Sequence, residues 1–135
     1  MYLLILNLSA KDYKKFLERI FPKLSIHAVT REEEIGDFIE KTDILFTGNI
    51  SDELIKKAQN LKGIQALTTG VDSIINLPSL RKEVLITSAR GIHGPQMSEM
   101  AVLLMLALNR NFQKVIRNQE QRVWERWPGR TSSSD

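Results

Sequence analysis

The stretch SIHAVTREEEIGDFIEKTDILFT, residues 25–47, indicates the fold class of this chain. Two short runs of mostly apolar residues, Ser25–Val29 and Ile44–Thr47, lie at its ends, and each has the length of a buried strand. Between them, residues 30–33 have the spacing of a helix capping box, and one helical face collects Ile35, Phe38 and Ile39. The stretch therefore predicts a strand, a helix and a second strand in succession.

The same alternation continues toward both ends of the chain. Residues 3–8 predict a strand, and Ser9 is a candidate cap for a helix whose apolar positions are Tyr13, Phe16, Leu17 and Ile20. Ser51 is a candidate cap for a later helix, and residues 64–68 and 84–87 predict the last two strands. Strict alternation with crossover connections predicts an α/β fold: a flavodoxin-like or Rossmann-like parallel five-stranded sheet with helices on both faces.

A helix without a polar face follows the last strand. Pro95 suits its first turn, and the helix is expected to run to about Arg110 through an unbroken apolar stretch at residues 100–108. A further helix is expected to carry Phe112, Val115, Ile116, Val123, Trp124 and Trp127. We therefore predict a flavodoxin-like domain over residues 1–94, connecting helices over 95–127 and a tail over 128–135.

Composition excludes several classes of protein. The chain has 135 residues, 42% hydrophobic and 26% charged, which is the balance of one soluble globular domain. Its net charge of +3 comes partly from basic residues after Leu108, but Glu120 and Glu125 interrupt them and no base-reading motif is present, so nucleic acid is not an expected partner. The start lacks a secretory leader, and the apolar run at residues 100–108 is too short to span a bilayer, so we expect a cytoplasmic protein without membrane contact.

Few side chains suggest catalysis by themselves. The sequence has no cysteine and no close grouping of histidine with carboxylates, so we expect no metal site. His93 is interpreted as a loop residue that contacts backbone or solvent, and His27 as a structural residue in a strand. In parallel sheets, ligands bind beyond the carboxyl ends of strands, which directs attention to the loop after residue 68. Gly70 in this loop allows unusual backbone conformations and close approach of a ligand.

Two segments carry a family resemblance: LKGIQALTTGVD at residues 61–72 and SARGIHGPQMSE at residues 88–99, just before the apolar helix. The chain resembles the N-terminal, substrate-side portion of D-isomer-specific 2-hydroxyacid dehydrogenases, in the glyoxylate/hydroxypyruvate reductase-like or phosphoglycerate dehydrogenase-like branch. It departs from that family at Ser88, where asparagine is frequent, and at Met100, where many members have histidine.

The resemblance implies roles for three residues in an oxidoreductase. The amides of Gly70 and Val71 are expected to bind the carboxylate of a small 2-keto or 2-hydroxy acid, and Thr69 to lie near the nicotinamide of NAD or NADP. The catalytic arginine of the complete enzyme is expected to supply the charge that the loop lacks. The alternative for this loop is a plain turn from strand to helix with Asp72 as the cap.

The resemblance also implies what this chain lacks. The sequence has no Gly-x-Gly-x-x-Gly turn and no residues that match the family's catalytic Arg, Glu and His, so we assign no catalytic residue. We expect a truncated chain without the nucleotide-binding domain, inactive alone and binding no cofactor. In the family, the apolar helix connects the two domains and helps to form a dimer, and we expect a homodimer through the segment from Met97 to Leu108.

A non-catalytic, flavodoxin-like binding or interaction module is the alternative function. A receiver-type module needs acidic residues after the first strand and at the end of the third, where this chain has Asn7 and Gly48-Asn49. A flavin or phosphate binder needs a loop rich in Gly, Ser or Thr after the first strand, and residues 8–11 do not form one. Both versions are disfavoured against the dehydrogenase interpretation.

Overall fold

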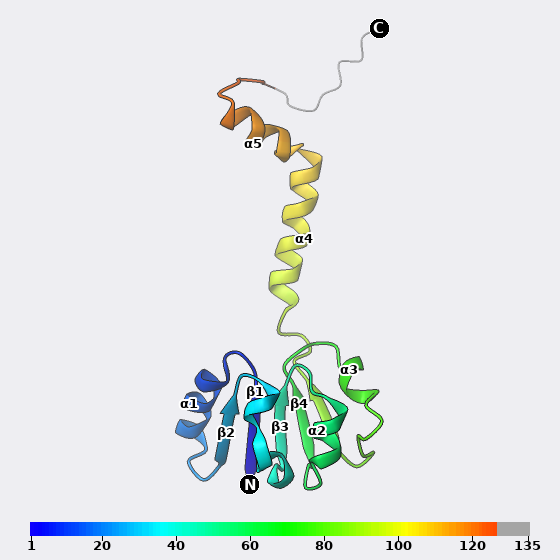
Figure 1. Cartoon of the computed structure of the whole chain (residues 1–135). Helices are drawn as coiled ribbons and strands as arrows, with labels where there is room; N and C mark the ends of the chain where they lie inside the picture. The colour runs from blue at the N-terminus through cyan, green and yellow to red at the C-terminus, as the bar shows by residue number, and fades with distance from the viewer. Residues whose placement is uncertain (127–135) are drawn as a thin grey trace. The chain divides into compact units, whose positions relative to one another are not determined.

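A parallel five-stranded sheet forms the centre of the first part of the chain (Figure 1). The computed structural model describes residues 1–126, and contacts divide the chain into two compact units, Met1–Gly91 and Ile92–Asp135. The strands are β1 (Tyr2–Leu6), β2 (Ser25–Val29), β3 (Ile44–Thr47), β4 (Gly63–Ala66) and β5 (Leu85–Ser88), in the order β2-β1-β3-β4-β5. This is the flavodoxin-like order, so the predicted fold class is confirmed.

The larger core lies on one face of the sheet. Leu4 of β1, Leu45 of β3 and Ile64 of β4 point to this face and are almost completely buried. A short 3₁₀ segment, η1 (Glu32–Glu34), comes before the elements that pack there, which are a second 3₁₀ segment, η2 (Gly36–Lys41), and two short helices, α2 (Asp52–Lys57) and α3 (Asp72–Ile75). Apolar strands buried in this way are typical of parallel sheets, whose two faces are normally covered.

The opposite face is covered only in part within the first unit. Helix α1 (Ala10–Ile20) packs over β1 and β2, where it buries Ala10 beside Leu3 and Ile5. On the same face the register aligns Ile44 of β3 with Gly63 and Leu85, and Leu85 is 69% exposed. The predicted apolar stripe of α1 has the right period, but three of its members are exposed: Tyr13, Phe16 and Ile20. Part of the sheet and part of α1 therefore present apolar surface to solvent in this unit.

The helix predicted to follow residues 30–33 along the chain is not an α-helix. Gly36 has a φ of 55°, a left-handed conformation that a continuous right-handed helix cannot contain, and the segment forms η1 and η2 instead. The predicted capping box is also wrong. The backbone N–H of Thr30 donates to Oε2 of Glu34 at 3.0 Å, one residue later than the spacing predicts, and Arg31 takes the cap position of η1.

Other element boundaries shift only slightly. Ser9 and Ser51 stand at the cap positions of α1 and α2 as predicted, yet neither makes a side-chain cap hydrogen bond. Strand β1 ends at Leu6 rather than at residue 8, and β4 begins at Gly63 rather than at residue 64. The predicted order of strands and helices is unaffected by these shifts.

The second unit consists of two helices in its described part. Helix α4 (Gly94–Asn109) has Pro95 in its first turn, and Asn111, with a φ of 47°, separates it from α5 (Phe112–Glu120). Every residue of α4 except Ala107 is exposed. Val123 and Trp124 follow α5 instead of belonging to it, and Trp127 and residues 128–135 lie outside the described residues. Within residues 1–126, no helix is long and apolar enough to cross a membrane.

An acidic side chain joins three strands at their amino ends. Asp43, just before β3, accepts a hydrogen bond from the backbone N–H of Tyr2 at 2.8 Å and from Nζ of Lys62 at 2.6 Å. The hydrogen bond from the Lys62 ammonium and the hydrogen bond from the Tyr2 amide both lower the pKa of Asp43 below its ordinary value of 3.8. Both bonds favour the ionised carboxylate, so the folded state binds this proton more weakly than the unfolded state.

The Asp43 interactions predict loss of stability in acid. Because the folded pKa is depressed, the stabilisation is present above about pH 4 and is lost as the pH falls through the folded pKa. We expect Asp43→Asn to remove this part of the pH dependence, measured as the free energy of unfolding in urea from pH 3 to 7. Asp37→Asn changes an exposed carboxylate and is the control. A wild type and an Asp43→Asn variant with parallel pH profiles would contradict the prediction.

Candidate functional site

The loop of residues 68–72 leaves the carboxyl end of β4 between two neighbouring strands. The N–H of Leu67, just before the loop, donates to the carbonyl of Thr47 at 2.9 Å, and the N–H of Ala89 donates to the carbonyl of Thr68 at 3.1 Å. The hydroxyl of Thr68 donates to the carbonyl of Gly70 at 2.7 Å. These bonds hold the loop against the ends of β3 and β5, which are the flanking strands in the sheet.

The amides of Gly70 and Val71 are available to a ligand. Within residues 1–126, neither N–H donates a hydrogen bond, and Gly70 is exposed. Gly70 does not have a positive φ, so the expected need for unusual backbone freedom is not the reason for a glycine here. A Cβ at Gly70 would lie 3.7 Å from Oδ2 of Asp72, an ordinary contact. Because Gly70 has no side chain, a ligand can approach its backbone amide closely.

Asp72 does not cap the helix that follows the loop. Val71 is the cap residue of α3, and Asp72 is already the first helical residue, with no side-chain cap hydrogen bond. The alternative interpretation, a plain turn capped by Asp72, is therefore wrong about the cap residue. The loop does lead into a short helix, as that interpretation expects. Because the Asp72 carboxylate lies beside Gly70, it also adds negative charge to the loop. Thr69, the residue expected near a nicotinamide, is exposed in the same loop.

The ends of β3 and β5 bring two further polar residues to this edge of the sheet. Asn49 follows β3, and its N–H donates a hydrogen bond to the hydroxyl oxygen of Thr47 at 3.2 Å. A Cβ at Gly48 would lie 3.6 Å from Cγ2 of Thr68, so the loops after β3 and β4 touch. Arg90 follows β5 and is exposed. Neither Asn49 nor Arg90 is predicted as a site residue from the sequence, because only the strand order shows that they flank the Gly70 loop.

The histidines are in other surroundings. The ring of His27 stacks on Phe38 with centroids 4.7 Å apart, and its Nε2 lies 3.4 Å from the carbonyl of Glu34, as fits a structural residue. His93 occupies the cap position of α4 without a side-chain cap bond and is exposed. Over residues 1–126, no group of His, Cys, Asp and Glu has the arrangement of a metal site.

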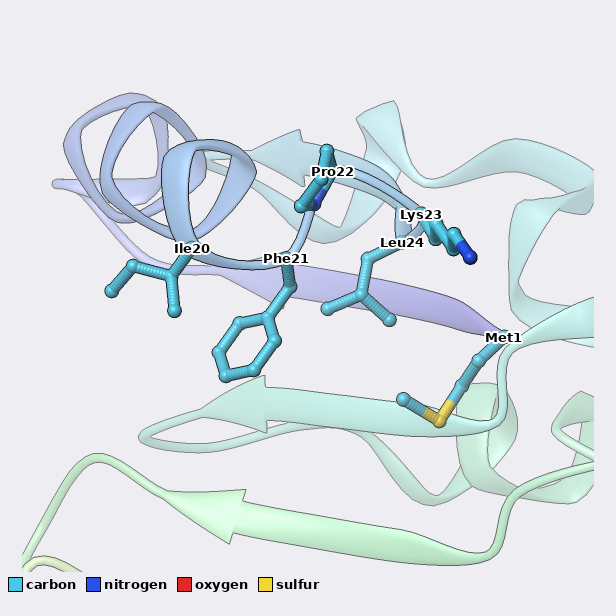
Figure 2. Close-up of a pocket in the computed structure, with 6 residues that line it drawn as sticks. All are labelled: Met1, Ile20, Phe21, Pro22, Lys23 and Leu24. Atoms are coloured by element: carbon cyan, nitrogen blue, oxygen red, sulfur yellow. The ribbon is translucent and has the colours of Figure 1, made fainter.

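A mostly apolar hollow of about 460 Å³ lies near the amino ends of β1 and β2 (Figure 2). Gly70 follows the carboxyl end of β4, at the opposite end of the parallel sheet. Its lining comes from Met1 at the start of β1 and from residues 20–24, between α1 and β2. In Figure 2 the side chains of Ile20, Phe21 and Leu24 extend toward the same side of the ribbon. Most of the lining is apolar, with Lys23 as its charged side chain, and none of Thr69, Gly70 and Val71 belongs to it, so this hollow is separate from the candidate acid site.

Comparisons with known proteins bear on the family. The chain is similar to a D-isomer-specific 2-hydroxyacid dehydrogenase family protein from Aeromonas salmonicida subsp. salmonicida A449, with 28% identity and a TM-score of 0.80, over 92% of this chain and 40% of that one. NAD-dependent formate dehydrogenase from Staphylococcus aureus shares the fold, with 20% identity and a TM-score of 0.70 over 93% of this chain and 43% of that one. No family model matches.

A curated relative agrees with the solved structures. D-3-phosphoglycerate dehydrogenase from Methanocaldococcus jannaschii is 25% identical over 119 residues, which are 86% of this chain and 22% of that protein. The chain thus spans less than half the length of each of these relatives. In sequence and in fold, the chain resembles one portion of the D-isomer-specific 2-hydroxyacid dehydrogenases, and the resemblance inferred from residues 61–99 is confirmed.

Proposed function

We propose that this chain is the substrate-side portion of an NAD(P)-dependent oxidoreductase that acts on small 2-hydroxy or 2-keto acids. In this proposal the amides of Gly70 and Val71 bind the carboxylate of the acid, and Thr69 lies near the nicotinamide. The observation that carries the proposal is a pair of consecutive amides without a hydrogen-bond acceptor among the described residues, in a loop fixed between two strand ends. Such amides are strong donors to an anion.

The chemistry assigned to the loop is binding and orientation. Two N–H donors aimed at one carboxylate position the acid so that its C2 faces a hydride donor or acceptor, and positioning of this kind contributes substantially to rate. The complete reaction moves a hydride between the nicotinamide and C2. It also needs a proton donor and a group that polarises the carbonyl, and we assign no residue of this chain to either task.

The residues present do not fit a whole dinucleotide. Solved relatives include proteins in complex with NAD and with NADPH. This sequence has no Gly-x-Gly-x-x-Gly turn, and the Gly70 loop offers Thr69 as a single contact. We therefore propose that the chain alone binds no cofactor and is inactive alone.

Gly70→Ala tests the loop directly. The added methyl group fits beside Asp72 but narrows access to the amides, so we expect the affinity for pyruvate to fall roughly tenfold with little loss of stability. The measurement is a titration of the ¹⁵N-labelled chain, in which the Gly70 and Val71 amide signals should move in the wild type. Gly63→Ala, at the other end of β4, is the matched control and should keep the wild-type affinity.

Two results would count against the proposal. Wild-type amide signals of Gly70 and Val71 that do not respond to pyruvate would contradict the assigned site. Stoichiometric binding of NADH in the same titration would contradict the proposed lack of a cofactor site.

We further propose that the chain forms a homodimer through the α4 segment from Met97 to Leu108. Eight large apolar side chains of this segment are more than half exposed: Met97, Met100, Val102, Leu103, Leu104, Met105, Leu106 and Leu108. A helix of 16 residues is about 24 Å long, and an apolar surface of that length favours burial against another molecule. A second copy supplies an identical surface, which two-fold symmetry can pair with the first.

A further inference from the structure

Arg90, at the end of the strand next to the Gly70 loop, is a cation without a partner among residues 1–126. It follows β5 directly after Ala89, whose N–H is bonded to the carbonyl of Thr68 at 3.1 Å. Gly91, with a φ of 91°, then turns the chain sharply. Arg90 is exposed and makes no hydrogen bond or ion pair with any other residue of the described range 1–126. Neighbouring strands lie roughly 4.8 Å apart, a gap that an arginine side chain can span.

The Gly70 loop has no positive charge of its own to attract a carboxylate. Its donors are neutral amides, and the carboxylate of Asp72 lies beside Gly70 and repels a second anion. Asp72 has no side-chain partner within the described residues, so its charge is not offset by an ion pair there. A nearby cation would therefore strengthen the binding of a ligand carboxylate at Gly70.

Sheet topology distinguishes Arg90 from other basic residues. Arg31 follows β2, which is separated from β4 by β1 and β3, and its Nε lies 3.4 Å from Oε1 of Glu34. Lys62 binds Asp43, and Arg81 donates to the carbonyl of Leu61 at 2.7 Å. Lys62 and Leu61 precede β4, so these contacts lie at its amino end. Arg90 is at the carboxyl end of the strand adjacent to β4.

We propose that the Arg90 guanidinium and the amides of Gly70 and Val71 bind one carboxylate together. This inference rests on the proposed function and adds a charged binding residue to it. The guanidinium supplies a charge-assisted and directional contact, and the amides fix the carboxylate against the main chain. The chain then carries its own cation for the acid, rather than depending entirely on an arginine from elsewhere in a complete enzyme.

Opposite charge changes at Arg90 and Asp72 test the inference. The ¹⁵N-labelled full chain is titrated with pyruvate, and affinity is read from the Gly70 and Val71 amide signals. Arg90→Gln should weaken binding roughly tenfold or more, because a charge-assisted contact is lost. Arg90→Lys should lie between Arg90→Gln and wild type, since it keeps the charge but loses the planar fork. Asp72→Asn should bind pyruvate more tightly than wild type, because a repelling charge is removed.

The outcomes separate this inference from the proposed function. If Arg90→Gln binds pyruvate as wild type does, with the same Gly70 and Val71 shifts, the loop is the acid site and the role of Arg90 is wrong. If pyruvate moves neither amide in the wild type, the proposed function fails and the shared site fails with it. The dispersion of the amide signals shows whether each variant is folded. Arg90 and Asp72 are both exposed, so we expect none of these substitutions to disturb the core.

Discussion

Replacing both Leu104 and Leu106 with glutamate is expected to convert a dimeric chain into a monomer. The two residues lie about 200° apart around α4, so a partner helix on either side buries at least one new charge. An unpaired buried carboxylate costs several kcal/mol, and about 3 kcal/mol raises the dissociation constant roughly a hundredfold. Size-exclusion chromatography with light scattering, over a range of protein concentrations, measures the change.

The matched control carries the same two charges on the other unit. Leu8 is 89% exposed and Ile75 is 48% exposed, so Leu8→Glu combined with Ile75→Glu changes net charge equally without touching α4. This control should remain dimeric. A wild-type chain that stays monomeric at high concentration would refute dimerisation through α4, and a dimer that survives both α4 charges would place the interface elsewhere.

Leu45→Ala is expected to lower the free energy of unfolding by roughly 3 kcal/mol. Leu45 is in β3, between β1 and β4, and has 0% exposure within the larger core. Truncation removes the burial of several methyl and methylene groups and leaves a cavity that close-packed neighbours fill only partly. Urea unfolding in the Leu104→Glu/Leu106→Glu background measures the effect without a contribution from association.

Leu85→Ala makes the same truncation on the partly covered face of the sheet. Because Leu85 is 69% exposed in the first unit, the change should cost less than about 0.5 kcal/mol. Equal losses for Leu45→Ala and Leu85→Ala would mean that Leu85 is covered in solution, and the description of this face as open would be wrong.

The strands were predictable because each one is a local pattern. A short apolar run such as residues 44–47 indicates a strand by its own length and composition, and Ser25–Val29 and Ile44–Thr47 have the bounds that the sequence predicts. The segment after Thr30 was mispredicted for a local reason as well. Its apolar spacing fits an α-helix, but the spacing does not show that Gly36 takes a left-handed conformation.

The candidate site was predictable only in part. The loop at Gly70 and Val71 was found from a family resemblance, and the structure adds that both amides lack an acceptor within residues 1–126. Asn49 and Arg90 lie 21 and 20 residues from Gly70 in the sequence, and no periodicity relates positions that far apart. The β2-β1-β3-β4-β5 order is what places the strand ends before Asn49 and Arg90 on either side of the loop.

The fold class, the apolar character of α4 and the loop that resembles a substrate site could all be inferred from the amino-acid sequence alone. The first two follow from periodicity and composition, which depend on neighbours along the chain, and the loop follows from a family resemblance carried by two short segments. Only the folded structure shows which strand ends meet, that Gly70 has no positive φ, and where Asp72 and Arg90 lie, whose charges have no partner within residues 1–126. These depend on strand pairing and through-space distance, because electrostatic attraction and ligand access are set by separation in space rather than along the chain.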